Sequence, residues 1–244
     1  GVDADIVDPN PSSVWASTLT RPITTNTTAR FMQALLSDFS ATEVQRVNQV
    51  VVSGFYEGKT TAEIARSIRG TKKNRYTDGI LNTTSRNAGV VARTAVNHTA
   101  TQARMGTLKA NSKVIKEWEF SATLDNRTSS TCKGLHGTKW PINEGPEPPR
   151  HFSCRSTILP VVPSLLDVFK GKERQASVGA GGPKVVDAPD NYFDWLKTQP
   201  KYFQEQALGK TKTKLFRNGG LTTEEFRKLT INKYGDPLTL DEMR

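Results

Sequence analysis

Both cysteines of the chain and two of its three histidines lie in one short stretch. Three residues separate Cys132 from His136, two separate His151 from Cys154, and a proline-rich segment joins the pairs. Thiolates and imidazoles are ligands that zinc prefers, and two short pairs joined by a hairpin are typical of small structural zinc sites. The sequence therefore predicts that Cys132, His151 and Cys154 lie together, with His136 or Asp125 as the fourth group.

Other chemistries of the same residues stay open. The segment also fits a metal-free hydrogen-bonded turn or a Cys132–Cys154 disulfide, although two cysteines in a long chain suit a reducing cytosol. A small nuclease would use His136 or His151 as the acid or base, with Arg127 or Arg155 on a phosphate. The sequence has no glycine-rich phosphate loop, Ser/His/Asp set or His-Glu-x-x-His motif, which favours a closed structural site.

The elements around these residues are expected to be short. Residues 117–124 alternate polar and apolar side chains, which predicts a strand with one buried face. The polar run 125–129 predicts a turn, because short polar side chains hydrogen-bond their own backbone. Pro146, Pro148 and Pro149 stiffen the approach to His151, and residues 157–162 predict an edge strand because they include Pro160.

Two motifs in this stretch resemble a known signature. Asp125-x-Arg127-Thr128-Ser129-x-x-Cys132 and Pro148-Pro149-x-His151-x-x-Cys154-Arg155 are similar to motifs of the phage head-morphogenesis family, the Mu F-like minor head proteins. The resemblance extends upstream to Ala92-Arg93-Thr94 and downstream into residues 195–219. Asp125, Arg127 and Arg155 would be structural motif residues, and many family members carry a cysteine where this chain has Ser156.

This resemblance implies a function in the virion. A minor head (capsid) protein of a tailed bacteriophage acts in procapsid and head assembly, associates with the portal protein or the major capsid protein, and stays inside the head near packaged DNA. We would then expect the chain in the host cytoplasm during assembly and in the virion afterwards, without enzymatic activity. The competing hypothesis is a small nuclease or group-transfer enzyme with the Cys/His hairpin as its site.

The positive charge of the chain is concentrated in its middle. Residues 66–155 contain 16 Lys and Arg against 6 Asp and Glu, which accounts for the whole net charge of +10. Such a basic region favours a polyanion partner, and we expect binding of double-stranded DNA without sequence preference. A solvated basic face is the alternative. The candidate DNA-binding residues are Arg66, Arg69, Lys72, Lys73, Arg75, Lys113 and Lys116.

We expect an α+β fold with a helical N-terminal half, a small Cys/His-stabilised β-hairpin unit and a helical C-terminal region. The expected divisions are an extended arm over 1–29, a head-morphogenesis-like domain over 30–165, a linker over 166–189 and a C-terminal helical region over 190–244. Trp15 is the candidate partner-binding residue of the arm, because it is a large aromatic in a polar segment. No apolar run reaches the length of a bilayer span, so no membrane partner is expected.

Helix boundaries follow from capping patterns. Ser40-x-x-Glu43, Thr60-x-x-Glu63 and Thr222-x-x-Glu225 each predict a helix start of the capping-box type. The longest helix is expected from Ser85 to about Ala110, preceded by a basic surface loop over 71–84. His98, midway along that helix, is expected to be a core or surface residue rather than a ligand. The aromatic residues beyond 190 are expected to form a core.

Overall fold

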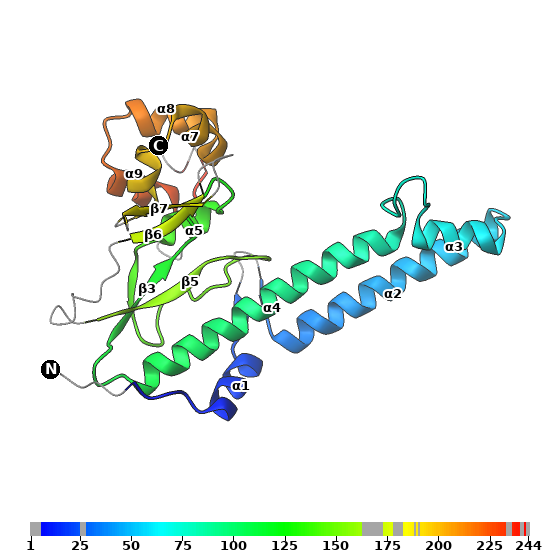
Figure 1. Ribbon diagram of the computed structural model, residues 1–244, viewed down its shortest axis with the longest axis horizontal. Helices are drawn as coiled ribbons and strands as arrows, with labels where there is room; N and C mark the ends of the chain where they lie inside the picture. Colours follow the sequence, from blue (N-terminus) through cyan, green and yellow to red (C-terminus); the bar gives the residue numbers. More distant parts are fainter. Residues whose placement is uncertain are drawn as a thin grey trace.

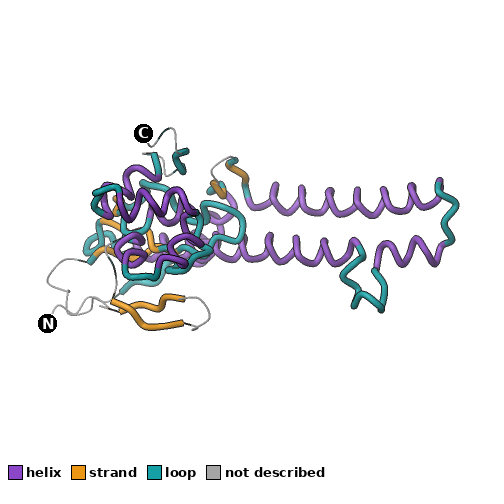
Figure 2. Tube along the Cα trace, turned by 90° about the horizontal axis from the view of Figure 1, so that it is seen from above, coloured by secondary structure: helices purple, strands orange, loops and turns teal. Residues whose placement is uncertain are grey.

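The computed structural model describes residues 6–24, 28–162, 173–177, 183–187, 189, 191–232, 236–239 and 242. Two long helices project from a globular part that contains the sheets and the short C-terminal helices (Figures 1 and 2). The fold is mixed helix and strand, with helices at both ends of the chain and a Cys/His group in between, as expected from the sequence. None of the described helices has both the length and the apolar character needed to cross a bilayer.

The N-terminal segment is not an extended arm throughout. Residues Pro11–Thr20 form helix α1, because Asn10 accepts a hydrogen bond from the Ser12 N–H as an N-cap and Pro11 begins the helix. Strands β1 (Ile23–Thr24) and β2 (Ala29–Arg30) then form an antiparallel pair that leads into α2. Residues 1–5 and 25–27 of the expected arm lie outside the described residues.

Helix α2 (Met32–Tyr56) is continuous, so the predicted helix start at Ser40 is wrong. Its Glu43 makes tertiary contacts with α4 (Ile80–Ala110) instead of forming a cap: it accepts hydrogen bonds from Thr84 and from Asn87 at 3.2 Å. The next predicted box is confirmed, because Thr60 and Glu63 cap helix α3 (Thr61–Arg69) reciprocally. Helix α4 begins five residues before the predicted Ser85 and ends at the predicted Ala110.

Three strands form the central sheet. Strand β3 (Glu117–Ser121) lies between β4 (Lys139–Pro141) and β5 (Thr157–Val161), and both pairings are antiparallel. The predicted edge strand is therefore confirmed as β5. A short helix that the sequence patterns did not predict, α5 (Ser130–Leu135), lies between β3 and β4 and is capped by Ser129. A core cluster under the sheet includes Trp118, Phe120, Met105 and Cys132.

The segment expected as a linker contains regular structure. Strands β6 (Glu173–Ser177) and β7 (Pro183–Asp187) form an antiparallel pair, and Ala176 makes a parallel bridge to Leu124. This correction concerns the described strands alone, since residues 163–172, 178–182, 188 and 190 lie outside the described residues. The two strands contain no glycine, and backbone pairing together with the buried Ala176 explains why they form within a segment expected as a linker.

The C-terminal region is helical, as predicted. It consists of α6 (Tyr192–Lys197), α7 (Lys201–Leu208), α8 (Lys210–Asn218) and α9 (Thr223–Thr230). The predicted box at Thr222 and Glu225 caps α9. The predicted aromatic core is also confirmed, since edge and tilted ring contacts join most of its members, although Tyr202 is exposed; the buried aromatics are Tyr192, Phe193, Trp195, Phe203, Phe216 and Phe226.

Candidate functional site

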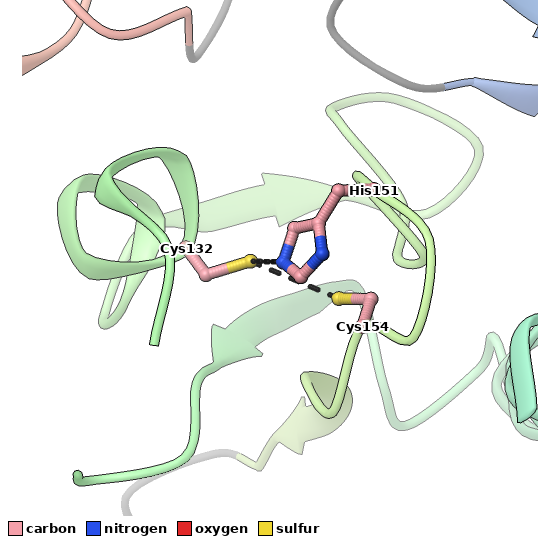
Figure 3. A group of neighbouring side chains, drawn as sticks. All are labelled: Cys132, His151 and Cys154. Atoms are coloured by element: carbon pink, nitrogen blue, oxygen red, sulfur yellow. Dashed lines mark hydrogen bonds between the residues drawn. The ribbon is translucent and has the colours of Figure 1, made fainter. Parts of the chain in front are cut away.

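Three of the four candidate ligands lie together. The Cys132 sulfur is 3.4 Å from His151 Nε2 and 3.7 Å from the Cys154 sulfur, and one ligand atom from each residue falls within 4.8 Å of the others (Figure 3). Cys132 comes from α5, whereas His151 and Cys154 come from the loop before β5. Both cysteines are free and buried, so the pair is not a disulfide.

These distances fit a tetrahedral zinc ion. With a zinc–sulfur bond of about 2.3 Å and a zinc–nitrogen bond of about 2.0 Å, two sulfurs lie about 3.8 Å apart and a sulfur and a nitrogen lie about 3.5 Å apart. The second ring nitrogen of His151, Nδ1, is 2.9 Å from the Phe152 carbonyl oxygen. An outer hydrogen bond of this kind orients a histidine so that Nε2 faces the metal.

The electrostatics of the group favour one ionised ligand, the thiolate of Cys154. The hydrogen bond with Cys132 lowers the pKa of the Cys154 thiol, and the neighbouring His151 adds to that effect. The pKa of Cys132 is raised in turn by its hydrogen bond to Cys154 and by burial. The hydrogen bond to Cys154 raises the pKa of His151. One thiolate beside an imidazole is a donor set that takes a soft or borderline cation such as Zn²⁺.

His136 is not part of this group. It follows α5 as its C-cap, is almost completely buried, and its Nδ1 accepts a hydrogen bond from the Ala122 N–H at 3.1 Å. The spacing of Cys132 and His136 suggested a ligand pair, but α5 and the return to β3 direct the imidazole to the backbone of the sheet. Among the described Cys, His, Asp and Glu residues, no fourth member joins Cys132, His151 and Cys154.

Asp125 is not the fourth group either. Arg155 donates two hydrogen bonds to its carboxylate, at 2.5 and 2.9 Å, and the Thr128 hydroxyl and the Arg127 N–H donate two more at 3.0 Å. Burial alone would raise the pKa of Asp125, but the hydrogen bonds and charge of Arg155 outweigh burial and hold it below its ordinary value. An anchored, ionised carboxylate is a structural group rather than a proton donor.

The Arg127 side chain is mostly exposed, and its Nε is 3.8 Å from Asp125. Arg155, rather than Arg127, therefore holds Asp125. The Asp125 carbonyl oxygen accepts a hydrogen bond from the Tyr192 hydroxyl at 2.6 Å, so the same turn also supports the C-terminal region.

Helix α4 holds the loop that carries His151 and Cys154, a role that the sequence patterns did not reveal. The Thr94 hydroxyl accepts a hydrogen bond from the Ser153 N–H at 2.9 Å. The Asn97 amide donates to the carbonyl oxygens of Cys154 and Ser156 at 3.1 and 3.0 Å. Thr94 belongs to the Ala92-Arg93-Thr94 motif, so the resemblance was the one signal that pointed to this support. Ser156 is buried, and its hydroxyl hydrogen-bonds to Cys132.

The seven candidate DNA-binding residues are all exposed, but they form two groups rather than one surface. Arg66 and Arg69 lie on α3, and Lys72, Lys73 and Arg75 lie in the loop before α4, at the far end of the projecting helices (Figure 1). Lys113 and Lys116 follow the other end of α4, whose 31 residues span about 46 Å. The concentration of charge in the sequence is thus divided between the two ends of one helix.

The loop that carries Lys72 and Lys73 has a defined conformation. The carboxylate of Asp78 accepts hydrogen bonds from the N–H and the hydroxyl of Thr71, both at 2.7 Å, and from the Asn74 amide at 2.9 Å. These bonds lower the pKa of Asp78 to about 2. The loop therefore carries its basic side chains on a defined backbone conformation and is more than a connection between helices.

Comparison with known proteins identifies the class of the central domain. Residues 45–159 match the family model described as Phage Mu protein F like protein. The chain therefore carries a Mu F-like domain over these residues, as the Asp125 and Cys154 motifs suggested. Neither the curated proteins nor the solved structures compared with the chain gave a match.

Proposed function

We propose that this chain is a minor head protein of a tailed phage, acting in head assembly at the portal and contacting packaged DNA without sequence specificity. The observation that carries the proposal is the Mu F-like domain together with the clustered Cys132, His151 and Cys154 inside it. A head morphogenesis family implies contacts with other head proteins, and the portal is the partner that the resemblance favours. The protein would then be found in the virion, inside the head.

The Cys/His group is proposed as a structural zinc site. Cys132, His151 and Cys154 would hold the ion, and zinc would tie α5 to the loop before β5, two elements that strand pairing alone leaves separate. Because these ligands are unorganised in the unfolded chain, metal binding would contribute directly to folding stability. The only carboxylate expected near the group, Asp125, is held by Arg155, which weakens the alternative of a zinc-dependent enzyme.

DNA contact is proposed at the exposed basic groups at both ends of α4. No acidic residue occurs between Asp78 and Glu117, so α4 and the segment after it contain only positive charge. Phosphate neutralisation by such side chains gives affinity without base recognition.

Trp15 offers a test of docking. Trp15 is one of the four tryptophans of the chain. It lies on α1, and its side chain is 61% exposed. We expect Trp15→Ala to leave the melting temperature unchanged while reducing incorporation into procapsids assembled with the portal and major capsid proteins. Normal incorporation of this variant would remove Trp15 from the docking surface. Failure of the wild-type chain to enter procapsids at all would contradict the head-protein proposal itself.

A further inference from the structure

Beyond Leu35, the projecting helices lack a core of their own. We call residues 32–93 the helical projection; it comprises α2, α3 and the first half of α4 (Figure 2). From residue 36 to residue 93, the only buried residues are Gly54, Gly70 and Gly79, which have no side chain to bury. Helices of this length take most of their stability from packing of an apolar face. The projection is therefore incomplete as a packing unit.

Helix α2 leaves one apolar face uncovered. Leu36, Val44, Val51 and Phe55 are 49%, 56%, 42% and 75% exposed, and at 3.6 residues per turn they lie within a sector of about 100°. We call these four residues the α2 stripe. The other side chains in the same sector, at positions 33, 37, 40 and 47, are Gln, Ser, Ser and Val, so the face has no ionisable group. Depletion of charge is characteristic of the core of a protein interface.

The charges of the projection are unbalanced. Every carboxylate of the projection is already engaged by a neighbouring residue: Asp38 by Arg30, Glu43 by Arg46, Glu57 by Lys59, Glu63 by Thr60 and Asp78 by Thr71. In the described part of the chain, seven cations of the projection have no carboxylate at salt-bridge distance: Arg66, Arg69, Lys72, Lys73, Arg75, Arg86 and Arg93. The stripe ends at Phe55, at the end of the projection where α3 and the basic loop lie (Figure 1).

We propose that the α2 stripe binds a helix of another protein, one with an apolar face flanked by acidic side chains. The apolar face would complete the packing that α2 lacks, and the acidic flanks would face the unpaired cations. A second copy of this chain fits less well, because two projections side by side would bring unpaired cations together. The inference rests on the proposed assembly role in taking another protein as the partner. The apolar face expected of the partner helix follows from α2 itself.

Two designed amphipathic peptides test this pairing. Both have the same leucine face and the same length, and one carries Glu and the other Lys at every flanking position. With the full chain, fluorescence anisotropy should show binding of the Glu peptide at least tenfold tighter than that of the Lys peptide, with an affinity that falls as salt rises. Equal binding of the two peptides, or no binding of the Glu peptide, would overturn the proposal.

Matched variants locate the contact. Val44→Thr with Val51→Thr keeps side-chain volume and branching on the stripe but adds hydroxyl groups, and should weaken binding of the Glu peptide at least tenfold. Val96→Thr with Val114→Thr makes the same change at exposed valines away from the stripe and should leave binding unchanged. Equal effects of the two pairs would exclude the stripe as the contact.

Sedimentation and DNA-binding measurements test two other possible partners of the α2 stripe, a second copy of this chain and nucleic acid. The wild-type chain should sediment as a monomer at micromolar concentration; a dimer that the stripe variants abolish would make a second copy the occupant and overturn the proposal. The stripe variants should bind duplex DNA as the wild type does, and lost DNA affinity would show that the stripe serves nucleic acid instead. Neither result depends on Trp15, so failure here is distinguishable from failure of the head-protein proposal.

Discussion

At the scale of single residues, the structure distinguishes the candidate ligand His151 from the nearby His136, which has a similar spacing to a cysteine. His151 Nε2 faces Cys132, whereas His136 accepts a hydrogen bond from the backbone of Ala122. Each imidazole lies within four residues of a cysteine in the sequence, so the spacing does not show which of the two histidines is the better candidate ligand. The direction in which the backbone presents each ring decides between them.

We predict that zinc binding requires His151 and does not require His136. Protein purified without chelator should contain about one zinc per chain, and His151→Asn or Cys132→Ser should remove it and lower the melting temperature by about 4 °C or more, as expected for a loss of about 2 kcal/mol in a chain of this size. His136→Asn should keep the metal, whatever its effect on stability. Elemental analysis and thermal unfolding measure both. Absence of stoichiometric zinc from the wild type, or its loss from the His136 variant, would contradict the proposed ligand set.

Asp125 gives a prediction about acid stability. Its pKa in the folded protein lies below the ordinary value of 3.8, so its bonds to Arg155 stabilise the fold fully above that pH. This contribution is lost as the pH falls below 3.8 and through the lower folded pKa, because the unfolded state then binds a proton more readily than the folded state. Asp125→Asn should cost about 2 kcal/mol at pH 7 and much less near pH 2.

Urea unfolding at several pH values measures this dependence. Asp38→Asn is the matched control, since Asp38 is an exposed aspartate paired with Arg30 at the surface, and its loss should cost less than about 1 kcal/mol. A cost for Asp125→Asn that stays the same from pH 7 to pH 2 would show that the carboxylate charge is not what stabilises this turn.

At the scale of elements, α4 organises the molecule. Its first half packs on α2 and α3, its middle holds the Cys154 loop through Thr94 and Asn97, and its last turns contribute Met105 and Leu108 to the core under the sheet. The same helix places the two exposed basic groups at its opposite ends. A ligand that contacts both groups must therefore extend along the helix.

We predict that the two ends contribute separately to DNA affinity. Replacing Lys72, Lys73 and Arg75 with alanine should reduce the slope of log affinity against log salt by about 3, and replacing Lys113 and Lys116 by about 2, if each side chain neutralises one phosphate. Anisotropy with a duplex between 50 and 200 mM salt, values chosen to span the steep range, gives these slopes. The control replaces Lys201, Lys210 and Lys214, exposed lysines of α7 and α8, and should leave the slope unchanged. A slope insensitive to all three sets would exclude DNA binding at α4.

At the scale of the whole molecule, the terminal regions are attached to the central domain by buried polar contacts. Lys133 of α5 donates a hydrogen bond to the Ala207 carbonyl oxygen at 2.5 Å, and burial lowers the pKa of this lysine to about 8. Arg227 donates to the Gly134 carbonyl oxygen at 3.1 Å. A β-carbon at Gly134 would lie 2.5 Å from Ile231, so glycine is required for the close approach of α5 to the end of α9.

The N-terminal segment is part of this packing as well. Thr18 is buried on α1, and its carbonyl oxygen is 3.2 Å from Nε2 of His98, whose pKa is lowered by burial. Ile23 packs with Met32 and Leu35 in a separate core cluster. The sequence predicted an extended arm over residues 1–29, whereas these contacts pack the described part of that segment against α4 and α2.

We predict that deleting residues 1–29 destabilises the rest of the chain. Loss of Ile23 alone removes about 2 kcal/mol or more of apolar packing, and exposure of His98 and of the α4 surface adds to this. Thermal unfolding by circular dichroism should show a melting temperature lower by about 5 °C or more. Trp15→Ala, which removes an exposed side chain, is the control. An unchanged melting temperature on deletion would mean that α1 packs too weakly to matter.

The sequence by itself determined what depends on neighbouring residues. Capping boxes gave the starts of α3 and α9 because their hydrogen bonds close within four residues, and alternation gave β3 because a strand has a period of two. The two motifs predicted the Mu F-like domain that the family model matches over residues 45–159, and Cys132, His151 and Cys154 were identified as a group by residue type. Charge counts gave a basic middle region, since net charge needs no structure.

Tertiary structure decided what depends on partners far along the chain. Ser40-x-x-Glu43 has the pattern of a cap, but Glu43 binds Thr84 and Asn87 across the helical projection, so α2 continues through it. His136 is excluded from the group because α5, which local patterns did not predict, directs it to the sheet. The basic residues are divided because α4 separates them by its length. In each case the deciding contact joins residues that lie far apart in the sequence or on opposite ends of one element, and local patterns carry no information about such contacts.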